Sequence, residues 1–244
     1  MLRSFIITLV AIIIFAIPTM ATVIHVPSDY LTIQAGINAS INGDTVLVAP
    51  GTYSESIRFG GKKIVLKSES GASTTIIQPP QHRTIIISLT NGEDTTTIIQ
   101  GFTIRGAVDT YAINVANAGV TLVENIVRDN TSPYSGLTHG SALRASNSTI
   151  NIRSNSFIAD TVTHLPGSGT LTFESTVASI TGNIFRDNYN NLWASSISSF
   201  ESSMIVDSNY FYNNFGYGAG AIGMTYNQKT IIKNNIFVFY NLCF

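Results

Sequence analysis

Short apolar segments alternate with Gly, Asn and Ser along most of this chain, and they recur at intervals of 24 to 30 residues. The clearest repeats are 97–103, 121–127, 151–157, 179–185, 205–211 and 231–237. Each contains a marker residue, which is Gly101, Asn125, Asn155, Asn183, Asn209 or Asn235. A repeat of this length with short strands is typical of a solenoid, in which no single coil has a core of its own.

Two further columns keep phase with the markers. The residue three positions before each marker is aliphatic, beginning with Ile98, and the residue two positions after it is mostly Phe, beginning with Thr103. Coils stacked about 4.8 Å apart would place equivalent residues over one another, so both columns are predicted to fill the interior. The Asn side chain is predicted to bridge to the next coil at a turn, where Asn and Gly101 also tolerate a left-handed backbone.

The segment before the repeats predicts a cap. Residues 32–39 read as a short helix, with Thr32 as the capping residue and with Ile33 and Ile37 on one face. A turn at 42–44 and a strand at 45–48 follow, and further short strands are expected at 56–59, 63–67, 75–78 and 84–88. Such a helix can cover the open end of a solenoid, which otherwise exposes strand edges.

The N-terminus has the pattern of a secretory leader. Arg3 precedes an apolar run at 5–17, and small residues stand at 19 and 21, so cleavage is expected after Ala21. The alternative is an uncleaved anchor, although a run of 13 residues is short for a membrane span. We therefore predict a signal peptide at 1–21, a single domain at 22–244, and a location outside the cell or at its surface.

Composition excludes several classes. Charged residues make up 11% and the net charge is −1, which is too neutral for a nucleic-acid partner. No second apolar run predicts a stable membrane span after removal of the leader. Cys243 is the only cysteine, so neither an intrachain disulfide nor a cysteine metal cluster is expected. The last residues, 237–244, form an apolar end with no polar cap, which predicts a chain incomplete at its C-terminus.

The opening of the chain resembles a known superfamily. The run Thr-Ile-Gln-Ala at 32–35 and the run from Gly43 to Glu55, together with the Asn-marked repeats, resemble the right-handed parallel β-helix proteins of the pectin-lyase-like superfamily. The resemblance implies an all-β, single-stranded parallel β-helix with an N-terminal cap helix. It also implies an association with polysaccharides, because the superfamily contains pectate, alginate and chondroitin lyases, polygalacturonases and epimerases, besides surface proteins without known catalysis.

The superfamily's catalytic motifs are missing. A polygalacturonase-like site needs clustered Asp residues and Gly-His-Gly, and the nearest element is Thr138-His139-Gly140 without an Asp pair. The motifs expected of pectin methylesterases and pectate lyases are also missing. The sequence thus leaves open whether the protein is an enzyme, and if it is one, predicts a polysaccharide lyase or a related carbohydrate-active enzyme.

One group of candidate residues is acidic. Asp129, Asp160 and Asp187 follow their markers at nearly the same distance in three consecutive coils. Carboxylate and amide oxygens brought together in this way can bind Ca²⁺, the one cofactor that the sequence suggests, or supply the two carboxylates of sugar hydrolysis. The alternative is a ladder of turn residues, in which Asp and Asn bond to the backbone while Arg128 and Arg186 neutralise the carboxylates.

A second group lies eight to ten residues after the markers, in the loops of four consecutive coils: Tyr134, His164, Trp193 and Tyr217. Stacked loops would form an aromatic and imidazole strip suited to sugar rings and hydroxyls. Lyase or epimerase chemistry on uronic acids needs a cation beside the carboxylate and a base for the C5 proton. Arg144 is the candidate cation, and His139 or Tyr134 is the candidate base. The alternative is that these aromatics pack over the outside of the sheet.

A third pattern points to another class. Phe-x-x-Asn occurs at 185–188 and 211–214, and 218–222 resembles Gly-Gly-Ala-Ile. Both motifs resemble the repeats of chlamydial polymorphic outer-membrane proteins, which are surface β-helices implicated in adhesion. The sequence thus supports two hypotheses: a secreted or cell-surface β-helix that binds or processes a polysaccharide or cell-surface glycan of the uronic-acid type, and a non-catalytic, adhesin-like surface protein.

Overall fold

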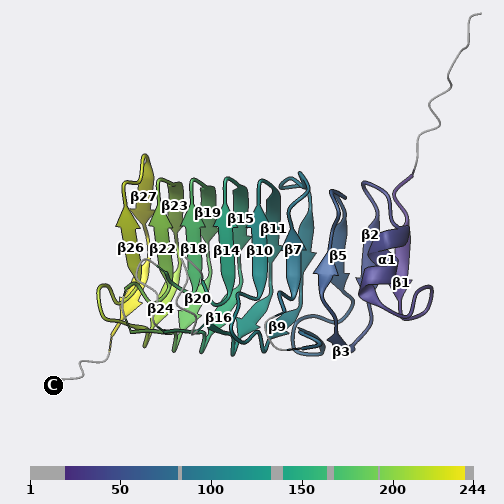
Figure 1. The fold of residues 1–244 in the computed structure, drawn as a ribbon, viewed down its shortest axis with the longest axis horizontal. Helices are drawn as coiled ribbons and strands as arrows, with labels where there is room; N and C mark the ends of the chain where they lie inside the picture. Colours follow the sequence, from purple (N-terminus) through teal and green to yellow (C-terminus); the bar gives the residue numbers. More distant parts are fainter. Residues whose placement is uncertain (1–19, 82–83, 133–139, 164–167, 192, 240–244) are drawn as a thin grey trace, which may run out of the picture.

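The computed structural model describes residues 20–81, 84–132, 140–163, 168–191 and 193–239. The chain winds into a solenoid in which all paired strands are parallel, and the coils stack from the N-terminus to the C-terminus along one axis (Figure 1). The predicted all-β, right-handed parallel β-helix with a short cap helix is confirmed.

The strands of the described residues form four sheets. Sheet A contains β1 (Val23–Val26), β2 (Thr45–Val48), β5 (Val65–Ser68), β8 (Ile98–Gln100), β11 (Gly119–Val123), β15 (Thr149–Arg153), β19 (Val177–Thr181), β23 (Ser203–Asp207) and β27 (Thr230–Lys233). Sheet B contains β3 (Gly51–Ser54), β6 (Thr75–Gln78), β9 (Thr103–Arg105), β12 (Ile126–Arg128), β16 (Ser156–Ile158), β20 (Ile184–Arg186), β24 (Tyr210–Tyr212) and β28 (Ile236–Val238). Sheet C contains β4 (Ile57–Arg58), β7 (Ile87–Leu89), β10 (Ile113–Ala116), β14 (Leu143–Ser146), β18 (Leu171–Glu174), β22 (Ile197–Phe200) and β26 (Ile222–Thr225). Sheet D contains β13 (Thr131–Ser132), β17 (Thr161–Val162), β21 (Tyr189–Asn190) and β25 (Phe215–Gly216).

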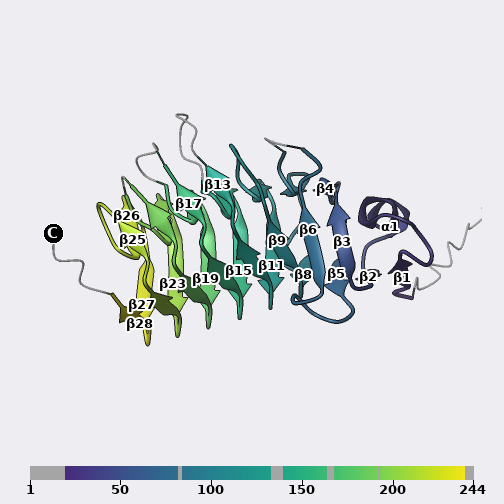
Figure 2. The same ribbon diagram turned by 90° about the horizontal axis from the view of Figure 1, so that it is seen from below.

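Each of the central coils visits the sheets in the order C, A, B and D (Figure 2). The coil that begins at β14 passes through β15, β16 and β17 before the chain returns to sheet C at β18. The turns from C to A, from A to B and from B to D in this coil contain two residues each, whereas the connection from D back to C is a longer loop. The longer loops of these coils therefore all lie between the end of a strand in sheet D and the start of a strand in sheet C.

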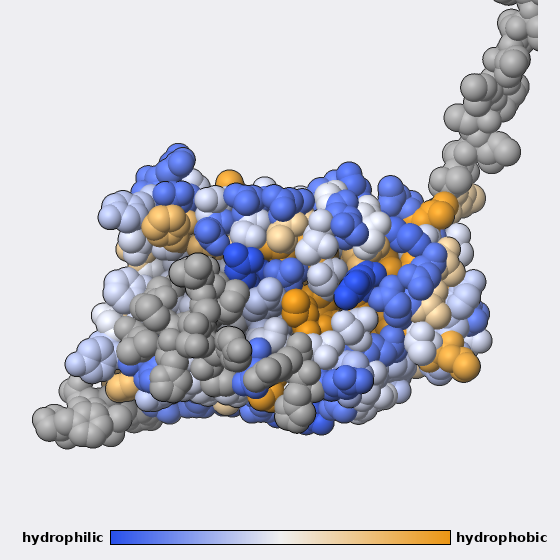
Figure 3. All heavy atoms as spheres, viewed as in Figure 1, coloured by the Kyte–Doolittle hydropathy of each residue, from blue (hydrophilic) through white to orange (hydrophobic). Residues whose placement is uncertain are grey.

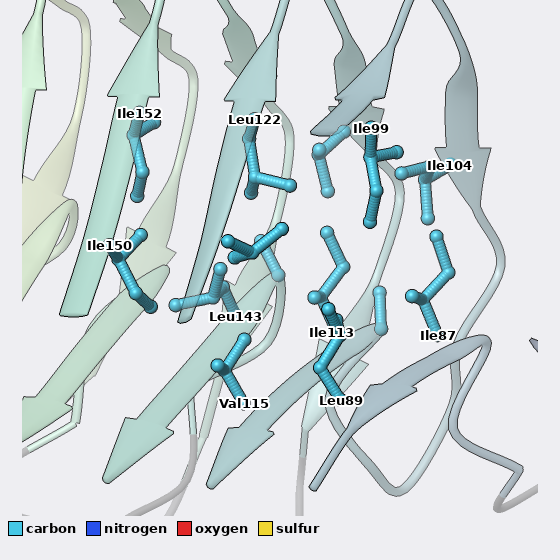
Figure 4. Close-up of a cluster of buried hydrophobic side chains, with 14 of the residues drawn as sticks. Ile87, Leu89, Ile99, Ile104, Ile113, Val115, Leu122, Leu143, Ile150 and Ile152 are labelled. Atoms are coloured by element: carbon cyan, nitrogen blue, oxygen red, sulfur yellow. The ribbon is translucent and has the colours of Figure 1, made fainter. Parts of the chain in front are cut away.

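The interior is a set of apolar columns. Aliphatic side chains from sheets A, B and C meet inside the coil, among them Ile99, Leu122 and Ile152 (Figure 4). These three and Ile180 are at most 1% exposed. The rings of Phe157, Phe185, Phe211 and Phe237 stack along the axis with centroids 4.8–5.0 Å apart. The strand spacing sets this distance, so one residue type repeated in phase packs against itself.

The predicted asparagine ladder is confirmed between sheets A and B. The backbone N–H of Asn125 donates to Oδ1 of Asn155, and the same bond continues through Asn183 and Asn209 to Asn235, at 2.8–2.9 Å. Each of these Nδ2 groups also donates to a backbone carbonyl of the preceding coil, as from Asn155 to Leu122 at 2.9 Å. These bonds satisfy buried backbone N–H and C=O groups that the sharp turns from sheet A to sheet B would otherwise leave without partners.

The first repeat is placed differently from the prediction. Thr103 pairs with Ile126, so Phe102 and not Gly101 occupies the ladder position, and its N–H donates to Oδ1 of Asn125. The left-handed backbone occurs at the position just before each ladder residue, with φ of 77° at Gly101 and 54° at Glu124. Ile99 and Ile104 therefore replace Ile98 and Thr103 as the interior residues of this coil, and both are fully buried.

A second ladder occupies the turn between sheets B and D. It contains Asn130, Asp160, Asn188 and Asn214, and the residue before each has a φ of 50–57°. The N–H of Asn130 donates to Oδ1 of Asp160 at 2.9 Å, and the N–H of Asp160 donates to Oδ1 of Asn188 at 3.0 Å. An aspartate thus stands in a buried position that its neighbours fill with asparagine.

Helix α1 (Ile33–Ala39) covers the N-terminal end of the solenoid, as predicted, and buries Ile33 and Ile37 (Figure 1). The Thr32 hydroxyl accepts from the N–H of Ala35 at 3.1 Å. The carboxylate of Glu55 accepts from the N–H groups of Ile33 and Gln34, both at 2.9 Å. Opposite the helix C-terminus, Nζ of Lys62 donates to the carbonyls of Ile37 and Asn38 at 2.7 and 2.6 Å. The two side chains complement the helix dipole at both ends.

We expect Glu55→Ala to lower the free energy of unfolding by about 1–2 kcal/mol, because two N–H groups of the first turn lose their acceptors. Urea unfolding followed by circular dichroism measures the change. The control is Glu69→Ala at an exposed carboxylate, unlike the half-buried Glu55, and this variant should stay within about 0.5 kcal/mol of the parent. Equal losses in both variants would show that Glu55 does not anchor the helix.

The last coil is more exposed than those before it. Phe237 and Ile232 are each 41% exposed, whereas their equivalents Phe211 and Val206 are fully buried. The expected C-terminal incompleteness and the leader at 1–21 stay predictions. In the part of the chain that the structure describes, no helix has the length and apolar character needed to cross a membrane.

Candidate functional site

The loops from sheet D to sheet C vary in length, unlike the two-residue turns at the other corners of the central coils. They follow Ser132, Val162, Asn190 and Gly216. Loops on a rigid scaffold are where binding residues collect, because their sequence can change without disturbing the core. The outer face of sheet C, to which they return, is therefore the first place to search for a site.

Register places one row of side chains along this outer face. Consecutive partners in the row are Arg58, Ser88, Asn114, Arg144, Thr172, Ser198 and Gly223. Alternate residues on the same strands, such as Ile57, Leu143 and Leu171, are fully buried in the core. The row is polar and, apart from its two arginines, made of small or medium side chains (Figure 3 views this face).

Arg144 is the predicted cation, and the structure places it at the centre of this row. Its Nη2 lies 3.1 Å from Oε2 of Glu174, with 21% of the Arg144 side chain and 40% of the Glu174 side chain exposed. Nη1 also donates to the Ser146 hydroxyl at 3.4 Å. The guanidinium is thus held in place by the sheet face, while the carboxylate beside it competes with any anionic ligand.

Arg58 is a second cation that sequence reasoning missed. It is exposed and lies in the same row as Arg144, three strand spacings away, which is about 14 Å. A groove of about 450 Å³ adjoins it, lined in part by Ser56, Ser88 and Thr90. The sequence does not connect Arg58 to Arg144, because β4 has only two residues and its coil has no asparagine marker.

Trp193 lies at the other end of the row. Its indole covers the outer face of Gly223, where a Cβ atom would come within 2.5 Å of Nε1. The Trp193 N–H donates to Oδ1 of Asn190 at 3.2 Å, and its carbonyl accepts from the N–H of Gly218 at 3.3 Å. The loop backbone therefore fixes the ring on sheet C, about 14 Å from Arg144 by strand count.

The remaining strip residues divide into two groups. Tyr217 is in the next D-to-C loop and is 82% exposed. Tyr134, His139 and His164 lie outside the described residues, so their placement stays a prediction. Among the predicted binding and catalytic residues, Arg144 and Trp193 lie on the outer face of sheet C. Tyr217 is in a loop that returns to this sheet.

The floor between the arginines and the indole is polar. Thr172 and Ser198 are 3% exposed, and the Thr172 hydroxyl accepts from the N–H of Gly169 at 3.1 Å. Next to Arg144, Oδ1 of Asn114 and the hydroxyl of Ser141 are buried and have no hydrogen-bond partner among the described residues. Unpaired polar atoms of this kind are unusual in native proteins and favour a ligand or solvent donor nearby.

The three candidate metal ligands are not brought to one point. Asp160 is buried in the second ladder, and burial raises its pKa well above the usual range for Asp. Asp129 and Asp187 instead stand at left-handed turn positions, paired with Arg128 and Arg186. The three carboxylates therefore do not fit a Ca²⁺ ion, and among the described residues no group of three or more His, Cys, Asp or Glu could hold a metal.

The Phe-x-x-Asn motif has an architectural explanation. Phe185 and Phe211 belong to the interior ring stack, while Asn188 and Asn214 belong to the second ladder. The Gly-rich run 218–222 connects sheet D to β26, where Gly220 faces the ring of Phe239. These motifs therefore follow from close coil packing and do not favour adhesion over other functions.

No protein family and no curated protein matches the sequence. Among solved structures, the chain is similar to an alginate lyase from Paenibacillus sp. str. FPU-7, with 12% identity over 88% of this chain and 99% of that chain, at a TM-score of 0.38. It is also similar to the catalytic domain of a GH87 α-1,3-glucanase in complex with tetrasaccharides, with 11% identity over 92% of this chain and 58% of that chain, at a TM-score of 0.35. Likeness at this level carries no argument about activity.

Proposed function

We propose that the outer face of sheet C binds a polysaccharide of the uronic-acid type. The observation that carries the proposal is the single row that places Arg58, Arg144 and the Trp193 indole on one face at even spacing. A guanidinium recognises a carboxylate with paired hydrogen bonds, and an indole covers the apolar face of a sugar ring. The row is straight because it follows the solenoid axis, so it suits an extended polymer.

The charge of the face supports an anionic ligand. Two arginines stand in the row and one carboxylate, Glu174, stands beside it. Between the two arginines the row carries Ser88 and Asn114, both half-buried, whereas Thr172 and Ser198 lie between Arg144 and the indole and are 3% exposed. The Ser88 hydroxyl and the Asn114 amide can bond to sugar hydroxyls, which gives orientation in addition to charge.

Cleavage by elimination is the reaction that this face suits best. A lyase removes the C5 proton and breaks the bond between C4 and the bridging oxygen, which leaves a C4–C5 double bond on the sugar. The oxygen departs with the bonding electrons and takes a proton from solvent to give the hydroxyl of the other fragment. Arg144 would neutralise the carboxylate and so acidify the C5 proton, while Tyr134 or His139, predicted in the loop that precedes β14, would take it. The expected leader would export the chain to where such polymers occur.

The test uses the purified protein with polygalacturonate, alginate and chondroitin. Retention on each polymer measures binding, and the absorbance of unsaturated uronate measures cleavage. Binding with product supports a lyase, whereas binding without product supports the non-catalytic surface protein. Absence of both on all three polymers would refute the proposed function.

We expect Glu174→Gln to tighten binding of a uronate polymer by about threefold to tenfold, because it removes the carboxylate that pairs with Arg144. Arg144→Gln should weaken binding by a similar factor. Affinity electrophoresis in gels containing the polymer measures both changes. The matched control is Glu124→Gln at the opposite side of the coil, which should leave mobility unchanged. Equal behaviour of all three variants would argue against binding at sheet C.

A further inference from the structure

A shallow polar groove follows the turn between sheets C and A, on the far side of sheet C from the loops. Its first part has a volume of about 710 Å³ and is lined in part by Asp94, Asn117, Asn147 and Thr149. Its second part, of about 490 Å³, is lined in part by Glu201, Ser203 and Tyr226. Ser175 belongs to both parts, so the two form one continuous groove along the solenoid axis.

The groove has a regular set of side chains, one from each coil. They are Asn117, Asn147, Ser175, Glu201 and Tyr226, with φ between 48° and 52°. Backbone bonds tie the first four of these positions to the coil after them, as from the N–H of Asn147 to the carbonyl of Glu174 at 3.0 Å. The side chains are therefore presented about 4.8 Å apart, close to the length of one sugar unit in an extended 1,4-linked glycan.

Tyr226 is not explained by the fold. A left-handed backbone is strained for a bulky residue and suits Gly or Asn, yet Tyr226 has a φ of 52° with its side chain 79% exposed. Its ring meets the ring of Phe200 edge to face, with centroids 5.7 Å apart, and Phe200 is itself 37% exposed. Neither ring contributes to the buried core, so an aromatic platform stands at one end of the polar groove.

The groove differs in charge from the proposed site on sheet C. Among the described residues that line it, none is Lys or Arg, and Asp94 and Glu201 carry exposed carboxylates. The hydrogen bond from Lys63 to Asp94, at 2.7 Å, lowers the pKa of that carboxyl to about 2, so it stays ionised. The buried carboxylate of Glu93 is occupied by the N–H groups of Gly61 and Asn91, both at 2.9 Å. The described lining of the groove therefore offers no cation to an acidic polymer.

We infer that this groove binds a neutral, extended, 1,4-linked glycan, with the Phe200–Tyr226 platform stacking against one sugar ring and Glu201, Ser175 and Asn147 bonding to hydroxyls. Exposed aromatic rings beside evenly spaced amide, hydroxyl and carboxylate groups are the combination that recognises sugars. The inference does not rest on the site at sheet C, because the row from Arg58 to Trp193 contributes no residue to the groove and the two favour ligands of different charge. Phe200 projects from the outer face of β22 next to Glu174, outside that row.

The test measures binding of cellohexaose, xylohexaose, mannohexaose and chitohexaose by calorimetry, with the matching disaccharides for comparison. At least one hexasaccharide should bind at least tenfold more tightly than its disaccharide, because several coils contribute. Tyr226→Asn should weaken that binding at least fivefold, and Asn147→Gly should weaken it measurably. Both replacements suit a left-handed backbone, so neither should lower the stability of the fold.

The matched control is Glu124→Asn, which changes an exposed left-handed residue at another corner and should leave the affinity within twofold. The inference is overturned if no hexasaccharide binds, or if Tyr226→Asn and Asn147→Gly leave the affinity unchanged. Arg144→Gln separates the two sites, because it should reduce binding of uronate polymers and spare the neutral hexasaccharide. Binding of uronate polymers therefore tests the proposed site on sheet C, and binding of neutral hexasaccharides tests the groove, each independently of the other.

Discussion

Replacing Phe185 with Ala should lower the free energy of unfolding by about 3–5 kcal/mol. Phe185 is fully buried between the rings of Phe157 and Phe211, with centroids 5.0 and 4.8 Å away. Removal of the ring leaves a cavity that the flanking rings cannot fill, because the strand spacing holds them in place. Two stacking contacts are lost together with the buried apolar area. Urea unfolding followed by circular dichroism measures the change.

Two variants make this prediction specific. Ile184→Ala removes an aliphatic side chain that points outward from the same strand and is 43% exposed, so it should cost about 1 kcal/mol or less. Phe185→Leu keeps most of the apolar volume and should cost less than Phe185→Ala. A loss below about 1.5 kcal/mol for Phe185→Ala would contradict a closely packed ring column.

The sequence predicted the fold because its columns are local and repeated. The cap helix, the strands at 45–48 and 75–78, and the ladder from Asn125 to Asn235 all follow from short-range patterns. The sequence pattern places Gly101 in the ladder, one position too early, because Gly suits the left-handed residue before the ladder as well as a turn position. The correct phase was present in the apolar pattern, since Ile99 and Ile104 are both aliphatic whereas Thr103 is not.

The candidate site was less predictable. The distance to its marker predicts Trp193, and closeness in sequence to His139 suggests Arg144, but the row that joins them depends on strand register across sheet C. Arg58 belongs to a coil without an asparagine marker, so no spacing connects it to Arg144. Tyr226 is a turn residue, and only its backbone angle and exposure single it out. Long-range register and local backbone strain were not accessible from one sequence.

Asp160 keeps the phase that its marker predicts but lies in a different environment from the one that its residue type predicts. It lies five positions after its marker, as do Asn130, Asn188 and Asn214, yet an Asp in a turn is usually solvated. The structure instead buries it completely, with Oδ1 accepting from the N–H and Nδ2 of Asn130 at 2.9 and 3.0 Å. Its Oδ2 atom is buried without a hydrogen-bond partner among the described residues. At the equivalent place in the next coil, Nδ2 of Asn188 donates to Phe157 and Asn214.

We therefore expect Asp160→Asn to raise the free energy of unfolding at pH 7 by about 1–3 kcal/mol, because an amide supplies the missing donor and removes a buried carboxylate. The gain should depend on pH. Burial raises the pKa of Asp160 above its unfolded value, so the folded protein binds the extra proton and the parent is most stable below the unfolded pKa. Its stability should fall as the pH rises through the folded pKa, whereas that of Asp160→Asn should lack this fall.

Urea unfolding of both proteins from pH 4 to pH 8 measures the difference, which should widen as the pH rises. The converse replacement, Asn188→Asp, is the matched control, because it places a second carboxyl in the ladder next to Asp160. It should lower stability at pH 7 more than at pH 4. A difference in the free energy of unfolding between the parent and Asp160→Asn that stays constant across this range would show that Asp160 keeps the same protonation state on unfolding. The buried ladder would then not hold a neutral carboxyl.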